Sequence, residues 1–340
     1  MKFKYIYFLI IVLISSCNSN KDLKFVKFGG YAQGTTYSIS YFDKNGTNYQ
    51  HDIDSILKDF DNSLSIYNPK SLVSRINMNE ADDIGNDNYF RKAFIKSLEV
   101  SKISDGAFDI TVCPLVNAWG FGFKHSVPID KHLVDSLMQF VGYKLIELKG
   151  NKIVKKDSRV MLDFNAIAQG YSVDIISRYL ESKDISNYIV EIGGEVFAKG
   201  KKLNGELWKV GIDKPIDNSS EDNRKLQVII HINNRAIATS GNYRKFVEID
   251  GKKYSHHIDP KTGSSTNNNL LSASVLANDC ITADAFGTAF LVLGLEKTKK
   301  ILGNHPELDA YLIFSNSSGE YEIYYTKGFK NLIVKEIILK

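Results

Sequence analysis

The sequence predicts an α+β fold in which mixed, largely antiparallel sheets pack against helices. Two observations support this class. The expected strands and helices follow one another without the regular alternation of parallel α/β proteins. The chain also has 340 residues, of which 43% are hydrophobic, and this is enough for a sizeable core. We expect one large domain, or two closely packed ones, over residues 25–340.

The first 24 residues read as a leader and a tether. Two lysines precede an apolar run that is too short for a membrane span. Residues 13–17 resemble a bacterial lipobox, which implies a signal peptide over residues 1–17 and lipidation of Cys17. The alternative is an ordinary secretory leader with an incidental cysteine. With residues 18–24 as a polar tether, we expect an exported lipoprotein of the inner membrane that faces the periplasm.

Charge and motif content exclude several classes of protein. A net charge of +4 is too balanced to indicate nucleic-acid binding. The chain has no CxxC, HExxH or GxSxG motif and no GxGxxG after a strand, which argues against zinc, serine-hydrolase and Rossmann sites. Cys113 and Cys280 could form a disulfide in an exported protein, but two separate buried thiols are the favoured interpretation.

Alternating β-rich residues predict paired strands near the start of the domain, and Asp43 to Gly46 carries a hairpin-turn signal. Apolar residues at helical spacing mark the helices. Expected helices cover residues 51–62, 87–104, 130–141, 167–183 and 282–293. Expected strands cover residues 25–30, 36–41, 160–163, 186–192, 207–212, 226–232, 236–239, 270–276, 311–315 and 321–325, with a hairpin at 244–254 that turns at Asp250–Gly251.

Residues 254–263 hold two histidines, a carboxylate, a proline and a Thr-Gly turn, which is a dense set of chemical groups. In an extended chain the side chains of His256 and His257 would point in opposite directions, so that only one could face a site. A histidine suits general-base work on a hydroxyl nucleophile. The alternative is a surface or core histidine, and Asp259 and Thr262 nearby favour the functional reading.

Asp284 and Thr288 are four residues apart on an expected helix and therefore share a face. With a backbone carbonyl and phosphate oxygens, these hard oxygen ligands would suit Mg²⁺. The alternative is helix capping, with Thr282 as the cap and Asp284 near the positive helix end. Composition alone favours capping.

Two further segments leave both readings open. The strand-to-helix connection at 163–170 could meet a phosphate or a metal, or it could be a helix start capped by Asn165. Trp119, in the glycine-flanked loop 106–122, could stack on an aromatic ring such as adenine or isoalloxazine. A buried core tryptophan is the usual alternative.

Eight segments, taken together and in order, resemble the FAD:protein FMN transferases, the ApbE-type flavin transferases. The resemblance runs from about residue 28 to residue 294. One segment would be weak evidence, whereas eight in order are strong evidence. The segments are residues 34–37, 64–69, 108–112 with 119–122, 163–174, 191–194, 238–241, 257–263 and 282–285.

This resemblance implies a T-fold-related α+β fold with the active site in a cleft between lobes. It implies an enzyme that cleaves FAD between its phosphates and moves FMN onto a Thr or Ser hydroxyl of an acceptor protein, releasing AMP. It also implies that His257 is the base, that Asp284 is catalytic, and that Mg²⁺ is bound by Asp284, Thr288 and the Ala166 carbonyl. The implied FAD contacts are Gln33, Asn62, Tyr67, Ala118, Trp119, Gly120, Asp163, Gln169, His257 and Ile258.

The chain departs from the family pattern at three positions. Gln169 stands where the family commonly has Lys, Gln33 where Met is common, and Cys113 where Gly is usual. A glutamine can hydrogen-bond a flavin or ribose but brings no charge. The implied partners are FAD, acceptor proteins of membrane redox complexes and, through the lipid, the membrane. An FAD pyrophosphatase that gives FMN and AMP, or a non-catalytic FAD-binding lipoprotein, are the alternatives.

Overall fold

The computed structural model describes residues 23–122, 129–216, 225–243, 246–249 and 252–337. The predicted leader, Cys17 and most of the predicted tether lie outside these residues, as does the expected turn at Asp250–Gly251. Strand β1 begins at Lys24, one residue before the expected first strand. None of the helices in the described part of the chain is long and apolar enough to cross a membrane.

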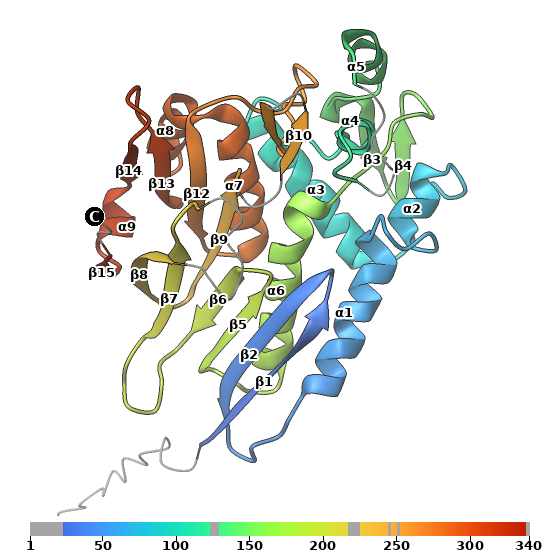
Figure 1. The fold of residues 1–340 in the computed structure, drawn as a ribbon. Helices are drawn as coiled ribbons and strands as arrows, with labels where there is room; N and C mark the ends of the chain where they lie inside the picture. Colours follow the sequence, from blue (N-terminus) through green and yellow to red (C-terminus); the bar gives the residue numbers. More distant parts are fainter. Residues whose placement is uncertain (1–22, 123–128, 217–224, 244–245, 250–251, 338–340) are drawn as a thin grey trace, which may run out of the picture.

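The fold is built on an eight-stranded sheet, in which every neighbouring pair of strands is antiparallel. This confirms the predicted α+β class. The sheet extends from β1 and β2 at the bottom of Figure 1 to β14 at the left. In spatial order its strands are β1 (Lys24–Ala32), β2 (Thr35–Asp43), β5 (Tyr188–Ile192), β6 (Glu195–Lys199), β9 (Arg235–Gly241), β12 (Leu270–Ala277), β13 (Asp309–Ser315) and β14 (Tyr321–Tyr325).

Three smaller sheets complete the β structure of the described residues. They are β15 (Ile333–Glu336), β8 (Leu226–Ile232) and β7 (Trp208–Asp213); β10 (Phe246–Ile249) with β11 (Lys252–Ser255); and β3 (Ile146–Lys149) with β4 (Lys152–Lys155). The helices are α1 (Gln50–Leu64), α2 (Leu72–Asn77), α3 (Asn88–Ile103), α4 (Cys113–Ala118), α5 (Lys131–Met138), α6 (Asn165–Ser182), α7 (Cys280–Leu293), α8 (Leu295–Asn304) and α9 (Lys327–Lys330), with a 3₁₀ turn at Tyr143–Leu145.

The large sheet has an apolar core on each face, because alternate residues of a strand point to opposite sides. In β9, Ala236 and Ala238 join the main core beneath the helices. Ile237, between them, joins a second core with Trp208 of β7 and Ile230 of β8. A third, small cluster around Leu115, Trp119 and Ile258 stands apart from both. Cys113 and Cys280 are buried and form no disulfide, as the favoured interpretation predicts.

The predicted hairpin turn at residues 43–46 is wrong. The hairpin lies earlier, where Gln33 and Gly34 take positive φ angles of 54° and 74° between β1 and β2. The Asp43 carboxylate instead accepts hydrogen bonds from the backbone N–H groups of Asn45 (3.0 Å) and Thr47 (2.9 Å), in the loop that leads to α1. Asp and Asn favour both kinds of turn, so composition could not separate them.

The predicted strand at 160–163 is also wrong, since this segment joins no sheet. Side chains take the place of a neighbouring strand. Asn77 donates to the Leu162 carbonyl (2.8 Å) and accepts from the Leu162 N–H (2.7 Å). Lys155 donates to the Val160 carbonyl at 3.0 Å. The segment that leads to Asp163 is thus fixed by hydrogen bonds that a strand pattern does not reveal.

Candidate active site

The α6–α7 interface carries the predicted metal ligands, and it is unusually close. A Cβ atom at Gly170 would lie 2.6 Å from the Cβ of Asp284 and 2.4 Å from the Cys280 carbonyl oxygen. Such distances exclude any side chain at this position. Glycine at 170 therefore lets the first half of α6 touch the first half of α7.

This contact brings Asp284 to the start of α6. Its Oδ2 atom accepts a hydrogen bond from the Gly170 N–H at 2.9 Å. In an α-helix the N–H of residue 170 points at the carbonyl of residue 166. The hydrogen bond therefore directs the Asp284 carboxylate towards the turn of α6 that carries Ala166, while the metal ligands themselves stay a prediction. Thr288 follows one turn after Asp284 on α7 and is only partly buried.

The start of α7 differs from the predicted capping arrangement. Asp279, rather than Thr282, is the N-cap, and its carboxylate accepts from the Thr282 N–H at 3.2 Å. Asp284 takes no part in capping α7 and is 7% exposed. Burial raises the pKa of Asp284 to about 7, although the hydrogen bond from Gly170 works in the opposite direction.

These donors fit Mg²⁺. The described residues contain no group of three or more His, Cys, Asp or Glu side chains that could hold a metal ion. The predicted set needs only one carboxylate, together with a carbonyl and a hydroxyl. Mg²⁺ usually takes one or two carboxylates and fills its other positions with water and substrate phosphates. Within the described part of the chain, no residue donates a hydrogen bond to the second oxygen of Asp284.

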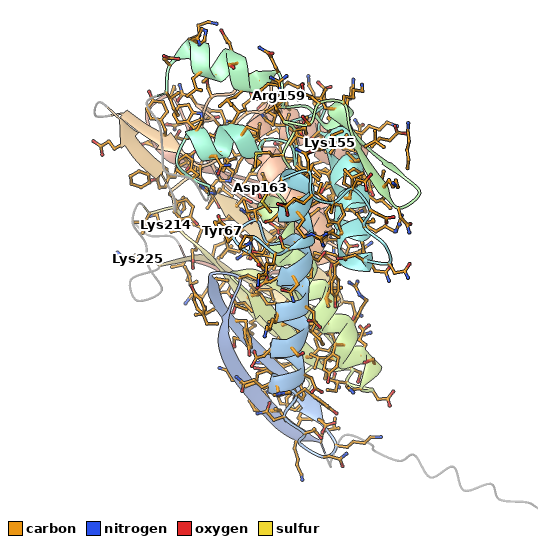
Figure 2. The ribbon with its side chains drawn as sticks, turned by 90° about the vertical axis from the view of Figure 1, so that its right-hand side faces the viewer. Tyr67, Lys155, Arg159, Asp163, Lys214 and Lys225 are labelled. Carbon is orange, nitrogen blue, oxygen red and sulfur yellow. The ribbon has the colours of Figure 1, made fainter. Side chains whose placement is uncertain are left out.

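Asp163 and Tyr67 lie together next to the start of α6. Figure 2 labels both residues in the middle of the molecule, beside α1. Asn165 donates to the Tyr67 hydroxyl at 3.4 Å, and its own N–H donates to the Asp163 carboxylate at 2.8 Å. The carboxylate at this helix start is therefore that of Asp163, and Asn165 does not cap the helix as the capping alternative would require. Burial raises the pKa of Asp163 to about 6. Asn62 lies at the end of α1 and accepts a hydrogen bond from Asn68 at 3.2 Å.

Gln33 and Gln169 meet at the tip of the β1–β2 hairpin. The Ser172 hydroxyl lies 3.1 Å from the Gln33 side-chain oxygen and 2.7 Å from the Gln169 carbonyl. The Gln169 side chain lies against Gly193, where an added Cβ would come within 2.9 Å of its amide nitrogen. The Gln33 amide nitrogen is buried and has no hydrogen-bond partner in the described structure. Two of the three positions that depart from the family pattern are thus linked through Ser172.

His257 stands on a separate loop and is 6% exposed. Its Nδ1 atom is buried without a hydrogen-bond partner in the described part of the chain. Burial, and to a smaller extent His256, hold the pKa of His257 well below its usual range. The expectation that the two histidines point in opposite directions is wrong, because their ring centroids are 3.9 Å apart. The chain bends at this point and is not extended.

Trp119 joins the His257 loop to α4. Its indole N–H donates to the Gly263 carbonyl at 2.9 Å, and its ring packs against Tyr254 with centroids 5.1 Å apart. Trp119 is 6% exposed and lies in the third cluster with the buried Ile258. Ala118 is buried beside it, and Gly120 follows with a φ of 80°. The contact of Trp119 with FAD stays a prediction.

The structure brings three pairs of residues close together: Gly170 with Asp284, Asp163 with Tyr67 through Asn165, and Gln33 with Gln169 through Ser172. All three lie at or beside the first turns of α6. Within the part of the chain that the structure describes, His257 makes no hydrogen bond with any of them. The Asp163 N–H donates to the Ile110 carbonyl (2.7 Å), which ties the segment before α6 to the segment before α4. The predicted cleft between lobes stays a prediction.

Comparison with known proteins decides the family. The model of the ApbE family matches residues 33–312. The chain belongs to the ApbE family. It is 34% identical to the FAD:protein FMN transferase of Vibrio cholerae serotype O1 over 333 residues, which cover 96% of this chain and 97% of that protein. It is also 34% identical to the FAD:protein FMN transferase of Haemophilus influenzae, covering 91% of this chain and 92% of that protein.

Solved structures of the ApbE family agree with the fold. The flavin transferase ApbE from Vibrio cholerae superposes with a TM-score of 0.81 at 31% identity, covering 91% of this chain and 99% of that one. The apo form of the Pseudomonas stutzeri flavinyl transferase ApbE gives a TM-score of 0.79 at 29% identity, covering 93% and 98%. The structural similarity therefore extends over nearly the whole length of both solved chains.

Sequence reasoning missed three residues that hold the site: Gly170, Asp174 and Asn77. Gly170 stood in a segment noted for its small residues, and this was the one available signal. Asp174 lies in the middle of α6, where an acid normally faces solvent, yet it is 4% exposed. Nothing in the sequence near Asn77 indicates its contact with Leu162, 85 residues away.

Proposed function

We propose that this protein is an FAD:protein FMN transferase that attaches FMN through a phosphoester bond to a Thr or Ser hydroxyl of an acceptor protein and releases AMP. The observation that carries the proposal is the hydrogen bond from Gly170 to Asp284. It joins a buried carboxylate of α7 to the backbone of α6, four residues after Ala166, in a chain of the ApbE family. This contact supports a metal site at the start of α6.

The proposed metal ligands are Asp284, Thr288 and the Ala166 carbonyl. Mg²⁺ bound there would neutralise charge on the pyrophosphate during an in-line displacement. Asp163 and Tyr67, beside the same helix start, are proposed to bind FAD. Gln33, Asn62, Ala118, Trp119, Gly120, Gln169, His257 and Ile258 complete the proposed set of FAD contacts.

His257 is the proposed general base. Its low pKa keeps the imidazole neutral near pH 7, which is the form that accepts a proton. The imidazole takes the proton of the acceptor hydroxyl, and the hydroxyl oxygen forms a bond to the phosphorus of the FMN moiety. The bond from this phosphorus to the bridging oxygen breaks, and AMP leaves with that oxygen. The low exposure of His257 limits competition from water as the nucleophile.

The test uses the chain from Lys21 with FAD, Mg²⁺ and a domain that carries a candidate acceptor Thr, taken from a membrane redox complex. Intact mass spectrometry of the acceptor is the measurement. A Mg²⁺-dependent mass gain equal to FMN less water supports the proposal. Free FMN and AMP without such a gain, across several acceptors, would instead indicate a pyrophosphatase. FAD that is bound and unchanged would indicate a binding protein.

We also propose that the protein is an exported lipoprotein, anchored through Cys17 to the inner membrane and facing the periplasm. The lipobox-like residues 13–17 support this. The expected result is that the full chain takes up labelled fatty acid and sediments with inner membranes, while Cys17→Ala does neither. Labelling of the variant at the wild-type level would contradict the anchor.

A further inference from the structure

The α6–α7 interface contains a second carboxylate contact that runs in the direction opposite to the first. Asp174, on α6, accepts hydrogen bonds from the first backbone N–H groups of α7. Its Oδ1 atom lies 2.7 Å from the Cys280 nitrogen, and its Oδ2 atom lies 3.0 Å from the Ile281 nitrogen. Asp284, on α7, accepts from the Gly170 N–H of α6. Each helix thus offers a carboxylate to the backbone of the other.

The first N–H groups of a helix lack partners within that helix. The Asp279 side chain satisfies the Thr282 N–H, and its backbone carbonyl accepts from the Ala283 N–H. Asp174 satisfies the two N–H groups before these, and a carboxylate is favoured at the positive end of a helix. Asp174 is buried, so its oxygens have little access to water as a substitute. The contact therefore fixes where α7 begins relative to α6.

The two contacts are one helical turn apart on each helix. Residues 170 and 174 are separated by four positions on α6, as are residues 280 and 284 on α7. A slip of either helix along the other would break both contacts at once. The absence of a side chain at Gly170 lets the two helices approach closely but does not fix how far one is shifted along the other. The two carboxylates determine that shift.

We propose that Asp174 is a positioning residue for the proposed metal site: it fixes the position of α7 along α6 so that Asp284 meets the Gly170 N–H, one helical turn after the Ala166 carbonyl. This inference rests on the proposed function for its role in catalysis, but the positioning itself does not. Asp174 does not contact FAD or metal in this scheme. It acts only through the main chain of α7.

The experiment compares Asp174→Asn with Asp279→Asn. Both variants remove one negative charge and weaken one cap at the same end of α7, but only Asp174 links α7 to α6. Two quantities are measured at pH 8 without acceptor: the Kd of Mg²⁺ for the FAD-loaded protein by calorimetry, and the exchange rate of the Gly170 amide by NMR. Urea unfolding gives the stability of each variant.

We expect Asp174→Asn to weaken Mg²⁺ binding by about tenfold or more, as do losses of residues that orient metal ligands. We expect the Gly170 amide to exchange at least about tenfold faster, because its acceptor, Asp284, moves away. Asp279→Asn should leave both quantities within about twofold of the wild type at a similar loss of stability. Unchanged values in Asp174→Asn, or equal changes in both variants, would overturn the proposal.

The two proposals can fail separately. A wild-type protein that transfers no FMN to any acceptor would contradict the proposed function, while faster Gly170 exchange in Asp174→Asn would still establish the positioning. Normal transfer by the wild type with unchanged Gly170 exchange in the variant would leave the function intact and reject the role of Asp174.

Discussion

The α6–α7 interface and the His257 loop carry the two halves of the proposed chemistry, yet they are built in different ways. The α6–α7 interface lies in the main core, and almost every residue of α7 before Thr288 is buried. The His257 loop rests on the third cluster, whose buried members are Leu115, Trp119 and Ile258. The proposed metal site is thus part of the main hydrophobic core, whereas the proposed base lies on a loop that packs against a small, separate hydrophobic cluster.

Their hydrogen bonds differ as well. Across the helix interface, buried carboxylates bind backbone N–H groups far apart in the sequence. The loop is held mainly by local backbone hydrogen bonds. Examples are those from the Gly263 N–H to the Asp259 carbonyl (2.8 Å) and from the Thr266 N–H to the His257 carbonyl (2.9 Å). Regions with few buried contacts open more easily than a core. We therefore expect changes at the interface to alter stability and metal binding together, and changes in the loop to alter transfer more selectively.

The largest effect is expected at Asp284. Asp284→Ala should reduce Mg²⁺-dependent transfer by at least about 10³-fold, because the metal supplies several kcal/mol of charge stabilisation. Some FAD should stay bound, since most of the proposed FAD contacts remain. Intact mass of the acceptor and flavin fluorescence measure the two quantities. Wild-type rates at ample Mg²⁺ would remove Asp284 from the metal site.

At His257 the expected effect is next in size. His257→Ala should slow transfer by about 10²-fold, as is usual for the loss of a general base, and should weaken FAD binding much less. The wild-type rate should not decline at pH 6.5, because the pKa of His257 lies well below this value. Single-turnover transfer rates across pH 5–9 provide the check. A variant that transfers at the wild-type rate would show that another group takes the proton.

The same pKa has a consequence for stability. Below pH 6.5 the unfolded chain protonates His257 while the folded protein does not, so the unfolded state binds more protons. This residue therefore makes the free energy of unfolding fall as the pH drops from 6.5 towards the folded pKa. His257→Gln should lose less stability than the wild type over that range in urea titrations. If the free energies of unfolding of the variant and the wild type fell in parallel with pH, the buried imidazole of His257 would not be neutral.

Gly170→Ala tests the helix interface by sterics alone. The new methyl group would meet Cys280 and Asp284 at distances that require the helices to separate, and we expect a loss of about 3 kcal/mol. Gly303→Ala, near the end of α8, is the matched control because nothing lies within 4 Å of its added Cβ. It should be neutral or stabilise by up to about 1 kcal/mol. Equal urea midpoints for the two variants would mean that the interface is not tightly packed.

Asp163 lies between the two regions and should show a conflict between stability and function. Its raised pKa means that ionisation of the buried carboxyl destabilises the folded protein as pH rises from 3.8 through about 6. Asp163→Asn should therefore be more stable than the wild type by about 3 kcal/mol at pH 8, since each pKa unit corresponds to about 1.4 kcal/mol. The gain should vanish near pH 4, and FAD binding should weaken. A pH-independent difference in thermal unfolding would contradict this.

The smallest effect is expected in the loop cluster. Trp119→Phe keeps an aromatic ring but removes the hydrogen bond to Gly263, at a cost of about 1 kcal/mol. Transfer should slow more than Mg²⁺ binding weakens, because Gly263 belongs to the loop that carries His257. An equal effect on both would show that the loop and the helix interface act as one unit.

The sequence was sufficient for the fold class, for most helices and strands, and for the pairing of Asp284 with Thr288 on one helix face. These features depend on local periodicity. It failed where long-range hydrogen bonds replace local patterns, as at residues 160–163, which Asn77 holds outside any sheet. It also failed at His256 and His257, because a bend in the backbone brings together two rings that an extended chain would separate.

The buried thiols have a consequence for experiments. Cys280 is fully enclosed, and burial raises the pKa of its thiol well above the usual range, so the reactive thiolate is scarce in the folded protein. Cys113 is 1% exposed. A disulfide reagent should therefore reach either sulfur only when the domain opens. In the chain from Lys21, which lacks Cys17, the rate of thiol labelling would report how often α7 and α4 leave the core, without any added probe.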